Sequence, residues 1–268
     1  MQQNRREQRL LLVTLNSPCN GQTSSVYAMF LYAPRYYETI QEGARRSAKE
    51  IVPILVQLFH PRSVVDVGCG RGTWLSVFKE FGVSDILGID GDYIDRKMLQ
   101  IPQEQFMPSD LRKPIEIQRK FDLVVSLEVA EHLPSDCAQT FVESLVRLGP
   151  AIVFSAAIPF QGGLHHVNEQ WPDYWARMFA QKGYLVVDCI RKRIWQNDNV
   201  EWWYAQNTIA FATPAYVESN PTTRQEIYNS NTSQLAIVHP KAYLLSAESK
   251  RNSLMTLVRK LVIRMGSK

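Results

Sequence analysis

Two carboxylates and an imidazole lie close together near the middle of the chain. Residues 128–132 read Glu-Val-Ala-Glu-His, so the side chains of Glu128, Glu131 and His132 fall within a single turn, where they can converge. Carboxylates with a histidine form a ligand set that suits Mg²⁺ or a similar divalent cation better than a structural zinc ion. The segment predicts a divalent-metal site or, without metal, residues that cap a helix and bond to neighbouring backbone.

A second polar segment, residues 162–169, carries two adjacent histidines. An imidazole with a pKa near 6.5 accepts a proton at neutral pH, which makes His165 and His166 candidates for a general base. Without a metal, one of these two is the expected catalytic residue.

A glycine-rich turn lies upstream of both segments. Residues 64–72 read Val-Val-Asp-Val-Gly-Cys-Gly-Arg-Gly, which is typical of a buried strand, a tight loop and the start of a helix. Glycines let a ligand approach the backbone closely, and a helix amino terminus offers unpaired N–H groups. The spacing is G-x-G-x-G and not the G-x-G-x-x-G of dinucleotide-binding proteins, and Asp66 beside the loop sits poorly with a pyrophosphate. The glycines are Gly68, Gly70 and Gly72.

The next apolar run ends in Asp90, eighteen residues beyond Gly72. A carboxylate at the end of the second strand of a nucleotide-binding α/β fold accepts hydrogen bonds from ribose hydroxyls. Taken alone, Asp90 is also compatible with the cap of a turn. Together with the glycine loop, it indicates a ribose-binding acid.

These groups need a scaffold that brings the ends of several strands together. After Pro61, short runs rich in Val and Ile alternate with helical patterns up to residue 212. Such runs suit strands buried on both faces, and their alternation with helices implies a parallel sheet covered by helices on either side. The predicted fold class is α/β, a Rossmann-like doubly wound sheet, preceded by mostly helical residues 1–60.

With these motifs in this order, the chain resembles the class I S-adenosylmethionine-dependent methyltransferases over about residues 60–212. Residues 66–72 resemble their first motif, Asp90 their ribose acid, residues 109–111 their adenine-edge motif and residues 121–128 their fourth-strand motif. The resemblance implies a seven-stranded sheet whose last strand is antiparallel, with residues 184–190 and 207–212 as the terminal pair.

The resemblance also implies which residues hold the cofactor. The glycine loop would face the amino-acid part of S-adenosylmethionine, Asp110 and Leu111 the adenine, and the backbone of Leu127 the methionine amino group. Tyr93 either packs on the adenine or has an ordinary packing role. The implied cofactor-binding set is Asp66, Gly68, Gly70, Gly72, Asp90, Tyr93, Asp110, Leu111 and Leu127.

The E-x-x-E-H segment is similar to that of two metal-dependent branches, the ubiquinone-pathway O-methyltransferases and the small-RNA 2′-O-methyltransferases. In the RNA branch a further histidine after the next strand completes the site, and His166 best matches it here. The resemblance thus implies a metal site of Glu128, Glu131, His132 and His166. Other class I methyltransferases carry the same segment without a metal.

Charge is distributed unevenly along the 268 residues. The net charge is +4, but residues 241–268 alone carry +6, which leaves −2 for residues 1–240. A slightly acidic body argues against a nucleic-acid partner, because that binding depends on many phosphate contacts from a basic face. Apolar residues recur at helical spacing among the basic residues from 254 to 265. This pattern predicts an amphipathic helix that contacts a membrane surface or a protein partner, or that docks on the body.

Cysteine usage and the ends of the chain give the expected location. Four scattered cysteines without C-x-x-C spacing suggest reduced thiols, and no apolar run approaches the roughly 20 residues of a membrane span. A short apolar run after the first arginines is too brief for a signal peptide, so a cytoplasmic protein is expected. The predicted domains are a helical lid at 1–60, a cofactor-binding domain at 61–217, and a polar linker with a basic helix at 218–268.

Taken together, these features predict a methyltransferase that acts on an oxygen of a small metabolite, sugar or natural-product intermediate. Five of the six tryptophans lie between residues 171 and 203, and aromatic walls suit planar acceptors and the apolar faces of sugars. Two alternatives remain open, an N- or carboxyl-methyltransferase (including one for a peptide carboxylate), and a non-catalytic methyltransferase-like binding subunit. RNA methylation also stays open through the resemblance of the metal site, although the body of the protein is not basic.

Overall fold

The computed structural model describes residues 34–230, 232–248 and 255. The chain divides into two compact units, one formed by Gln41–Ala242 and the other by Met1–Ile40 with Tyr243–Lys268. The first, called the core unit below, contains every described strand. Its limits lie outside the predicted boundaries at 60/61 and 217/218, while the lid and linker roles stay predictions. Most of the predicted basic carboxyl-terminal helix lies outside the described residues.

The core unit is built on a seven-stranded sheet with the order β3-β2-β1-β4-β5-β7-β6. Strands β1 to β5 pair in parallel, and β7 runs antiparallel to both of its neighbours, β5 and β6. The predicted α/β fold with an antiparallel last strand is therefore confirmed. The strands are β1 (Ser63–Val67), β2 (Asp85–Asp90), β3 (Phe106–Pro108), β4 (Leu123–Leu127), β5 (Ala151–Ser155), β6 (Leu185–Val187) and β7 (Ile209–Ala212).

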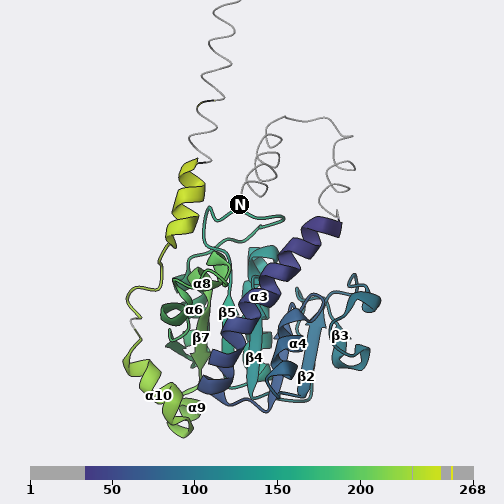
Figure 1. Ribbon diagram of the computed structural model, residues 1–268. Helices are drawn as coiled ribbons and strands as arrows, with labels where there is room; N and C mark the ends of the chain where they lie inside the picture. Colours follow the sequence, from purple (N-terminus) through teal and green to yellow (C-terminus); the bar gives the residue numbers. More distant parts are fainter. Residues whose placement is uncertain (1–33, 231, 249–254, 256–268) are drawn as a thin grey trace, which may run out of the picture. The chain divides into compact units, whose positions relative to one another are not determined.

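Helices cover both faces of this sheet (Figure 1). Buried residues of α3, α4, α7 and α8 join one hydrophobic cluster, and those of α5 and α6 join a second one. None of the described helices combines the length and the hydropathy that crossing a bilayer requires. The helices are α3 (Pro34–Phe59), α4 (Thr73–Glu80), α5 (Ala138–Leu148), α6 (Pro172–Gln181), α7 (Arg191–Ile194), α8 (Trp202–Asn207), α9 (Pro214–Ser219) and α10 (Pro221–Tyr228), and residues 240–248 are again helical.

Neighbouring residues of the central strands belong to opposite clusters. In β1, Val64 packs into the first cluster and Val65 into the second, and in β4 Val125 and Val124 divide in the same way. Side chains alternate across a strand, so strands that are apolar at every position are stable only between two helical layers. The uninterrupted apolar runs of the sequence thus account for the layered architecture.

The aromatic segment before the last strand is helical. Residues 202–204 open helix α8, and β7 begins only at Ile209. The N–H groups of Tyr204 and Ala205 both donate to the carbonyl of Glu201, which closes the first turn of that helix. Packing of the Tyr204 ring against Trp74, with centroids 5.1 Å apart, favours the helical arrangement over the local preference of aromatic residues for strands.

Candidate active site

The predicted site residues gather at the carboxyl ends of the central strands. The order of the strands along the chain reverses between β1 and β4, and ligands of open α/β sheets bind in the crevice outside the strand ends at such a point. The glycine loop follows β1, and Glu128 follows the neighbouring β4. The topology therefore brings the predicted cofactor residues and the predicted acceptor residues to one edge of the sheet.

The loop after β1 depends on glycine at the positions the sequence singled out. Gly68, Gly70 and Gly72 have φ angles of 85°, 54° and 79°, which are left-handed values that favour glycine. A Cβ on Gly68 would come within 2.3 Å of Cγ2 of Val129, so this backbone packs directly against the segment after β4. A Cβ on Gly70 would meet no described atom within 4 Å, so the loop is open to a ligand there.

The end of β2 anchors this loop. The N–H groups of Gly68 and Cys69 donate to the carbonyl of Ile89, at 2.7 and 3.2 Å, and the N–H of Gly70 donates to Oδ2 of Asp90 at 2.7 Å. Asp90 is buried. It therefore has a structural role in holding the loop in addition to its predicted role toward a ribose.

The second carboxylate oxygen of Asp90 is also engaged. Oδ1 accepts the N–H of Gly91 and the hydroxyl of Tyr93, both at 2.6 Å. The Tyr93 ring covers Gly91, where a Cβ would come within 2.1 Å of a ring carbon. Tyr93 thus lies beside the ribose acid through its hydroxyl, and its stacking on an adenine stays a prediction.

Asp66, in the strand that precedes the loop, has a strongly perturbed pKa. It is buried in β1, and its Oδ2 has no hydrogen-bond partner among the described residues. Burial and, second, the nearby charge of Asp90 raise the pKa of Asp66 to about 8. A buried acceptor without a partner among the described residues, next to the open approach at Gly70, fits the ammonium group at the amino-acid end of S-adenosylmethionine.

The segment predicted to contact the adenine follows β3 at the same edge. The N–H of Ser109 donates to the carbonyl of Asp90 at 2.8 Å, which places residues 109–111 beside the ribose acid. The Asp110 carboxylate accepts two bonds from the Arg112 guanidinium, which together with the Arg112 backbone N–H lowers the pKa of Asp110 to about 2. Leu111 is buried. The structure brings both residues to the site, and their contact with an adenine stays a prediction.

Glu128 begins the acceptor side immediately after Leu127, the last residue of β4. Its φ is +56°, a costly value for a residue with a side chain, and its N–H donates to the carbonyl and hydroxyl oxygens of Ser155, both at 3.0 Å. Its carboxylate accepts the side-chain amides of Asn207 and Gln161, each at 3.1 Å. Burial raises the pKa of Glu128, and these hydrogen bonds offset part of the effect.

Three of the four predicted metal ligands converge. Glu131, His132 and His166 each offer a ligand atom, and these atoms lie within 4.8 Å of one another. Glu131 is fully buried, and neither of its carboxylate oxygens has a hydrogen-bond partner among the described residues. Glu128 is not part of this cluster, and its carboxylate accepts the two side-chain amides described above. An acid without partners beside two imidazoles is a donor set that fits a cation.

Electrostatics within the cluster also favour bound positive charge. Burial, and then the charge of Glu128, raise the pKa of Glu131 well above its ordinary value. Burial, and then His166, lower the pKa of His132, so that this imidazole is neutral at neutral pH. The His132 and His166 rings meet edge to face with centroids 4.8 Å apart, whereas His165 is exposed. Of the two histidines proposed as a base, His166 is the one that the structure places in the cluster.

Two residues that hold Glu128, Gln161 and Asn207, were not singled out by sequence reasoning. Gln161 lies in a loop and Asn207 at the end of a short helix, and no residue spacing connects either of them with Glu128. Glu169 follows His166 by three residues in the second polar segment, and its carboxylate lies 3.0 Å from Nδ1 of His166. Burial, and then the charge of Glu128, raise the pKa of the Tyr204 hydroxyl.

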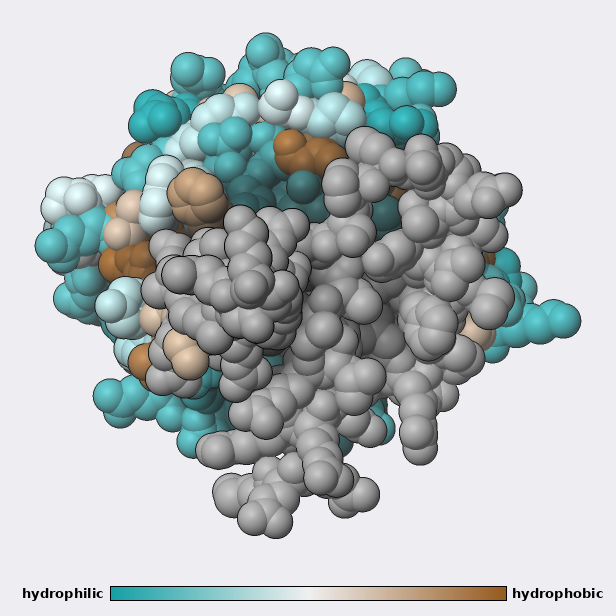
Figure 2. Space-filling view, turned by 90° about the horizontal axis from the view of Figure 1, so that it is seen from above, coloured by the Kyte–Doolittle hydropathy of each residue, from teal (hydrophilic) through white to brown (hydrophobic). Residues whose placement is uncertain are grey.

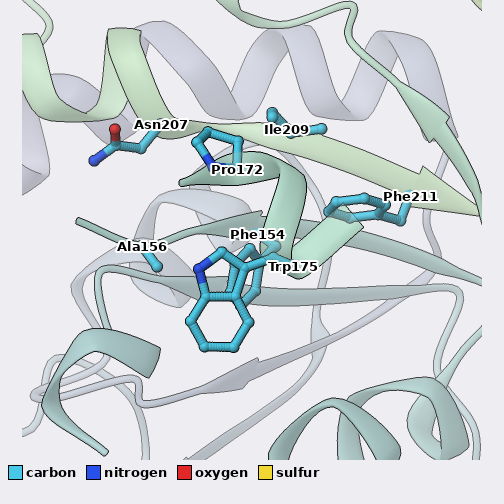
Figure 3. Close-up of a pocket in the computed structure, with 7 residues that line it drawn as sticks. All are labelled: Phe154, Ala156, Pro172, Trp175, Asn207, Ile209 and Phe211. Carbon is cyan, nitrogen blue, oxygen red and sulfur yellow. The ribbon is translucent and has the colours of Figure 1, made fainter. Parts of the chain in front are cut away.

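One cavity of the core unit is too small to be a binding pocket. It is lined by Phe154, Trp175, Asn207 and neighbouring residues between β5, β7 and α6 (Figure 3). Its volume is about 10 Å³, which has room for roughly one water molecule. Seen from above, the described residues in view are mainly hydrophilic, with hydrophobic ones as isolated spots (Figure 2).

Comparison with known proteins agrees with this arrangement. A family model described as a methyltransferase domain matches residues 37–210. Similar solved structures include an O-methyltransferase family protein from Burkholderia thailandensis, which is 13% identical and covers 79% of this chain and 68% of its own, with a TM-score of 0.50. The methyltransferase domain of the bacterial protein CtHen1 is 20% identical and covers 63% and 98%, with a TM-score of 0.46.

Magnesium protoporphyrin IX methyltransferase from Synechocystis, solved with bound SAH, is 18% identical and covers 64% and 84%, with a TM-score of 0.45. No curated protein matches the chain in sequence. The family model carries the assignment to the family, and the Burkholderia structure, with a TM-score of 0.50, shows the fold alone.

Proposed function

Since the chain belongs to the methyltransferase-domain family and is an S-adenosylmethionine-dependent methyltransferase, we propose that it methylates an oxygen of a small-molecule, sugar or natural-product acceptor with a divalent cation in its site. The observation that carries the proposal is the cluster of Glu131, His132 and His166 beside the glycine loop. Its carboxylate without a partner among the described residues and its two imidazoles support an acceptor site there.

The residues around the loop have separate tasks in holding the cofactor. Gly70 lets the ligand approach the backbone, Asp90 holds the loop and offers its carboxylate to the ribose, and Asp66 offers an unpartnered acceptor to the amino-acid end. S-adenosylmethionine supplies a methyl group that is already electrophilic. The protein mainly has to orient an acceptor oxygen and assist the loss of its proton.

The acceptor side matches this need for proton removal. A cation held by the cluster would lower the pKa of an acceptor hydroxyl and orient it. The lowered pKa of His132 keeps that imidazole neutral and able to share its lone pair at neutral pH. With two imidazoles and one carboxylate, the donor set also suits Mn²⁺ and similar transition ions, so we include Mn²⁺ beside the Mg²⁺ that the sequence suggested.

Metal dependence is tested with purified protein and labelled S-adenosylmethionine. Metabolite extracts are first screened for an acceptor of the label, and turnover is then measured in excess chelator and after titration with Mg²⁺ or Mn²⁺. We expect turnover to disappear with chelator and to return with metal in the wild type. Glu131→Gln should bind the metal more weakly, and Glu116→Gln, an exposed control, should behave as the wild type. Unchanged turnover in excess chelator would refute the proposed dependence on a divalent cation.

Variants of the two histidines distinguish methylation of a carboxylate from methylation of a hydroxyl. A carboxylate is already ionised at neutral pH and requires little help from a base. A His165→Ala, His166→Ala double variant should therefore lose most turnover if the acceptor is a hydroxyl. Near-normal turnover in that variant would replace the proposal with carboxyl methylation.

A further inference from the structure

Glu169 is the centre of a hydrogen-bonded loop on the acceptor side. Its Oε1 accepts the N–H of Gly162 at 2.8 Å and lies 3.0 Å from Nδ1 of His166, and its Oε2 accepts the N–H of Phe160 at 2.8 Å. The side chains of Glu169 and His166 are 19% and 12% exposed. One carboxylate thus organises two backbone groups and one imidazole.

The backbone of this loop adopts costly conformations to make these contacts. Phe160 and His165 have φ values of +68° and +60°, each of which costs roughly 1–2 kcal/mol for a residue with a side chain. The N–H groups of Val167 and Asn168 donate to the carbonyl of Glu131, at 2.8 and 3.0 Å. The loop is therefore attached to the cluster at one point and folded around Glu169 at another.

The His166 ring fits closely into this loop. A Cβ on Gly163 would come within 2.3 Å of Cε1 and Nε2 of His166, so the ring lies directly over the glycine backbone. With its Nδ1 engaged by Glu169, the ring has only Nε2 left to offer to Glu131 and His132. The loop therefore fixes the position of the ring and leaves Nε2 as the nitrogen that Glu169 does not engage.

We propose that Glu169 is a positioning residue that holds the proton of His166 on Nδ1 and so presents the bare Nε2 lone pair to the acceptor site. An ionised carboxylate only accepts hydrogen bonds, so its partner Nδ1 must be the protonated nitrogen. A lone pair on Nε2 is required whether His166 binds a cation or accepts a proton from the acceptor. The inference rests on the proposed role of His166 and gives Glu169 the task of selecting its tautomer.

The tautomer is measured directly in metal-free protein. ¹⁵N-labelled imidazoles report which ring nitrogen carries the proton, and the His166 signals are assigned with His166→Ala. At pH 8.5, about two units above the ordinary pKa of histidine, we expect the Nδ1–H form in the wild type. An Nε2–H signal for His166 in the wild type overturns the proposal without any variant, metal or acceptor.

Glu169→Gln provides the second arm. A glutamine amide can donate to Nδ1 and thereby favour the proton on Nε2, so we expect the tautomer to shift and Mn²⁺ affinity to fall by about 10- to 100-fold in calorimetry. In a His166→Ala background the same substitution should change Mn²⁺ affinity little, since Glu169 acts through His166. An equal loss of Mn²⁺ affinity in both backgrounds, or an unchanged His166 tautomer in Glu169→Gln, overturns the proposal. The Glu116→Gln variant controls for the loss of one surface charge.

The two proposals can fail separately. If the wild type binds no Mn²⁺, the cation is lost from the proposed function, while the ¹⁵N spectra still decide the role of Glu169. If Mn²⁺ binds and the tautomer is Nε2–H, the metal site stands and the role of Glu169 is refuted.

Discussion

The buried carboxylate of Asp66 should make the stability of the cofactor-free protein depend on pH in a way that Asp66→Asn removes. Its pKa is raised to about 8 in the folded protein by burial and by Asp90, against 3.8 in an unperturbed aspartate. Between these two values the folded state keeps a proton that the unfolded state has released. The free energy of unfolding therefore falls as the pH rises through this window.

The magnitude follows from the width of the window. One unit of pKa difference corresponds to about 1.4 kcal/mol, so Asp66 alone should lower the free energy of unfolding by roughly 3 kcal/mol between pH 5 and pH 7. The amide that Asp66→Asn introduces does not titrate in this range. The difference in unfolding free energy between wild type and variant should therefore change by this amount from pH 5 to pH 7. Any effect of the amide on stability is the same at both pH values and cancels.

Urea unfolding followed by tryptophan fluorescence at the two pH values measures this difference. Asp92→Asn is the matched control, because the side chain of Asp92 is 84% exposed, and its difference from the wild type should be nearly the same at both pH values. Comparing each variant with the wild type cancels the titration of groups that both share. If the difference in unfolding free energy between wild type and Asp66→Asn is the same at both pH values, the raised pKa of Asp66 is refuted.

Two further predictions concern the cofactor loop. Gly68→Ala should weaken S-adenosylmethionine binding in calorimetry at least tenfold, because its Cβ would meet Val129 at 2.3 Å. The control Gly183→Ala, with φ of +81° and no described atom within 4 Å, should cost about 1 kcal/mol of stability and leave binding unchanged. Equal effects of the two substitutions on binding would contradict this account. Tyr93→Phe should tighten cofactor binding by up to roughly tenfold, since the hydroxyl that donates to Asp90 no longer competes with the ribose, and unchanged or weaker binding would show that it does not compete.

The glycine loop and the position of Asp90 beside it were predictable because both depend on local features of the chain. Left-handed backbone at Gly68, Gly70 and Gly72 requires glycine, and a carboxylate at the end of β2 is recognisable from the apolar run before it. Strands buried on both faces leave an uninterrupted apolar pattern, so the doubly wound sheet was also recognisable.

Other features depend on which side chains meet in the folded core. The aromatic residues 202–204 suit a strand by local preference, yet packing of Tyr204 on Trp74 places them in a helix. Strand β3, of three residues, is too short to produce a pattern in the sequence and forms by pairing with β2.

The amino-acid sequence by itself therefore determined the fold class, the cofactor loop with Asp90, and the residue types of the acceptor side. Only the tertiary structure decided how those types are used. Glu128 and Glu131 look equivalent in the sequence, but amides from Gln161 and Asn207, remote along the chain, bind the first, while the second stays buried without a partner among the described residues. Hydrogen bonding between distant segments sets the availability of a carboxylate, and residue spacing carries no record of those partners.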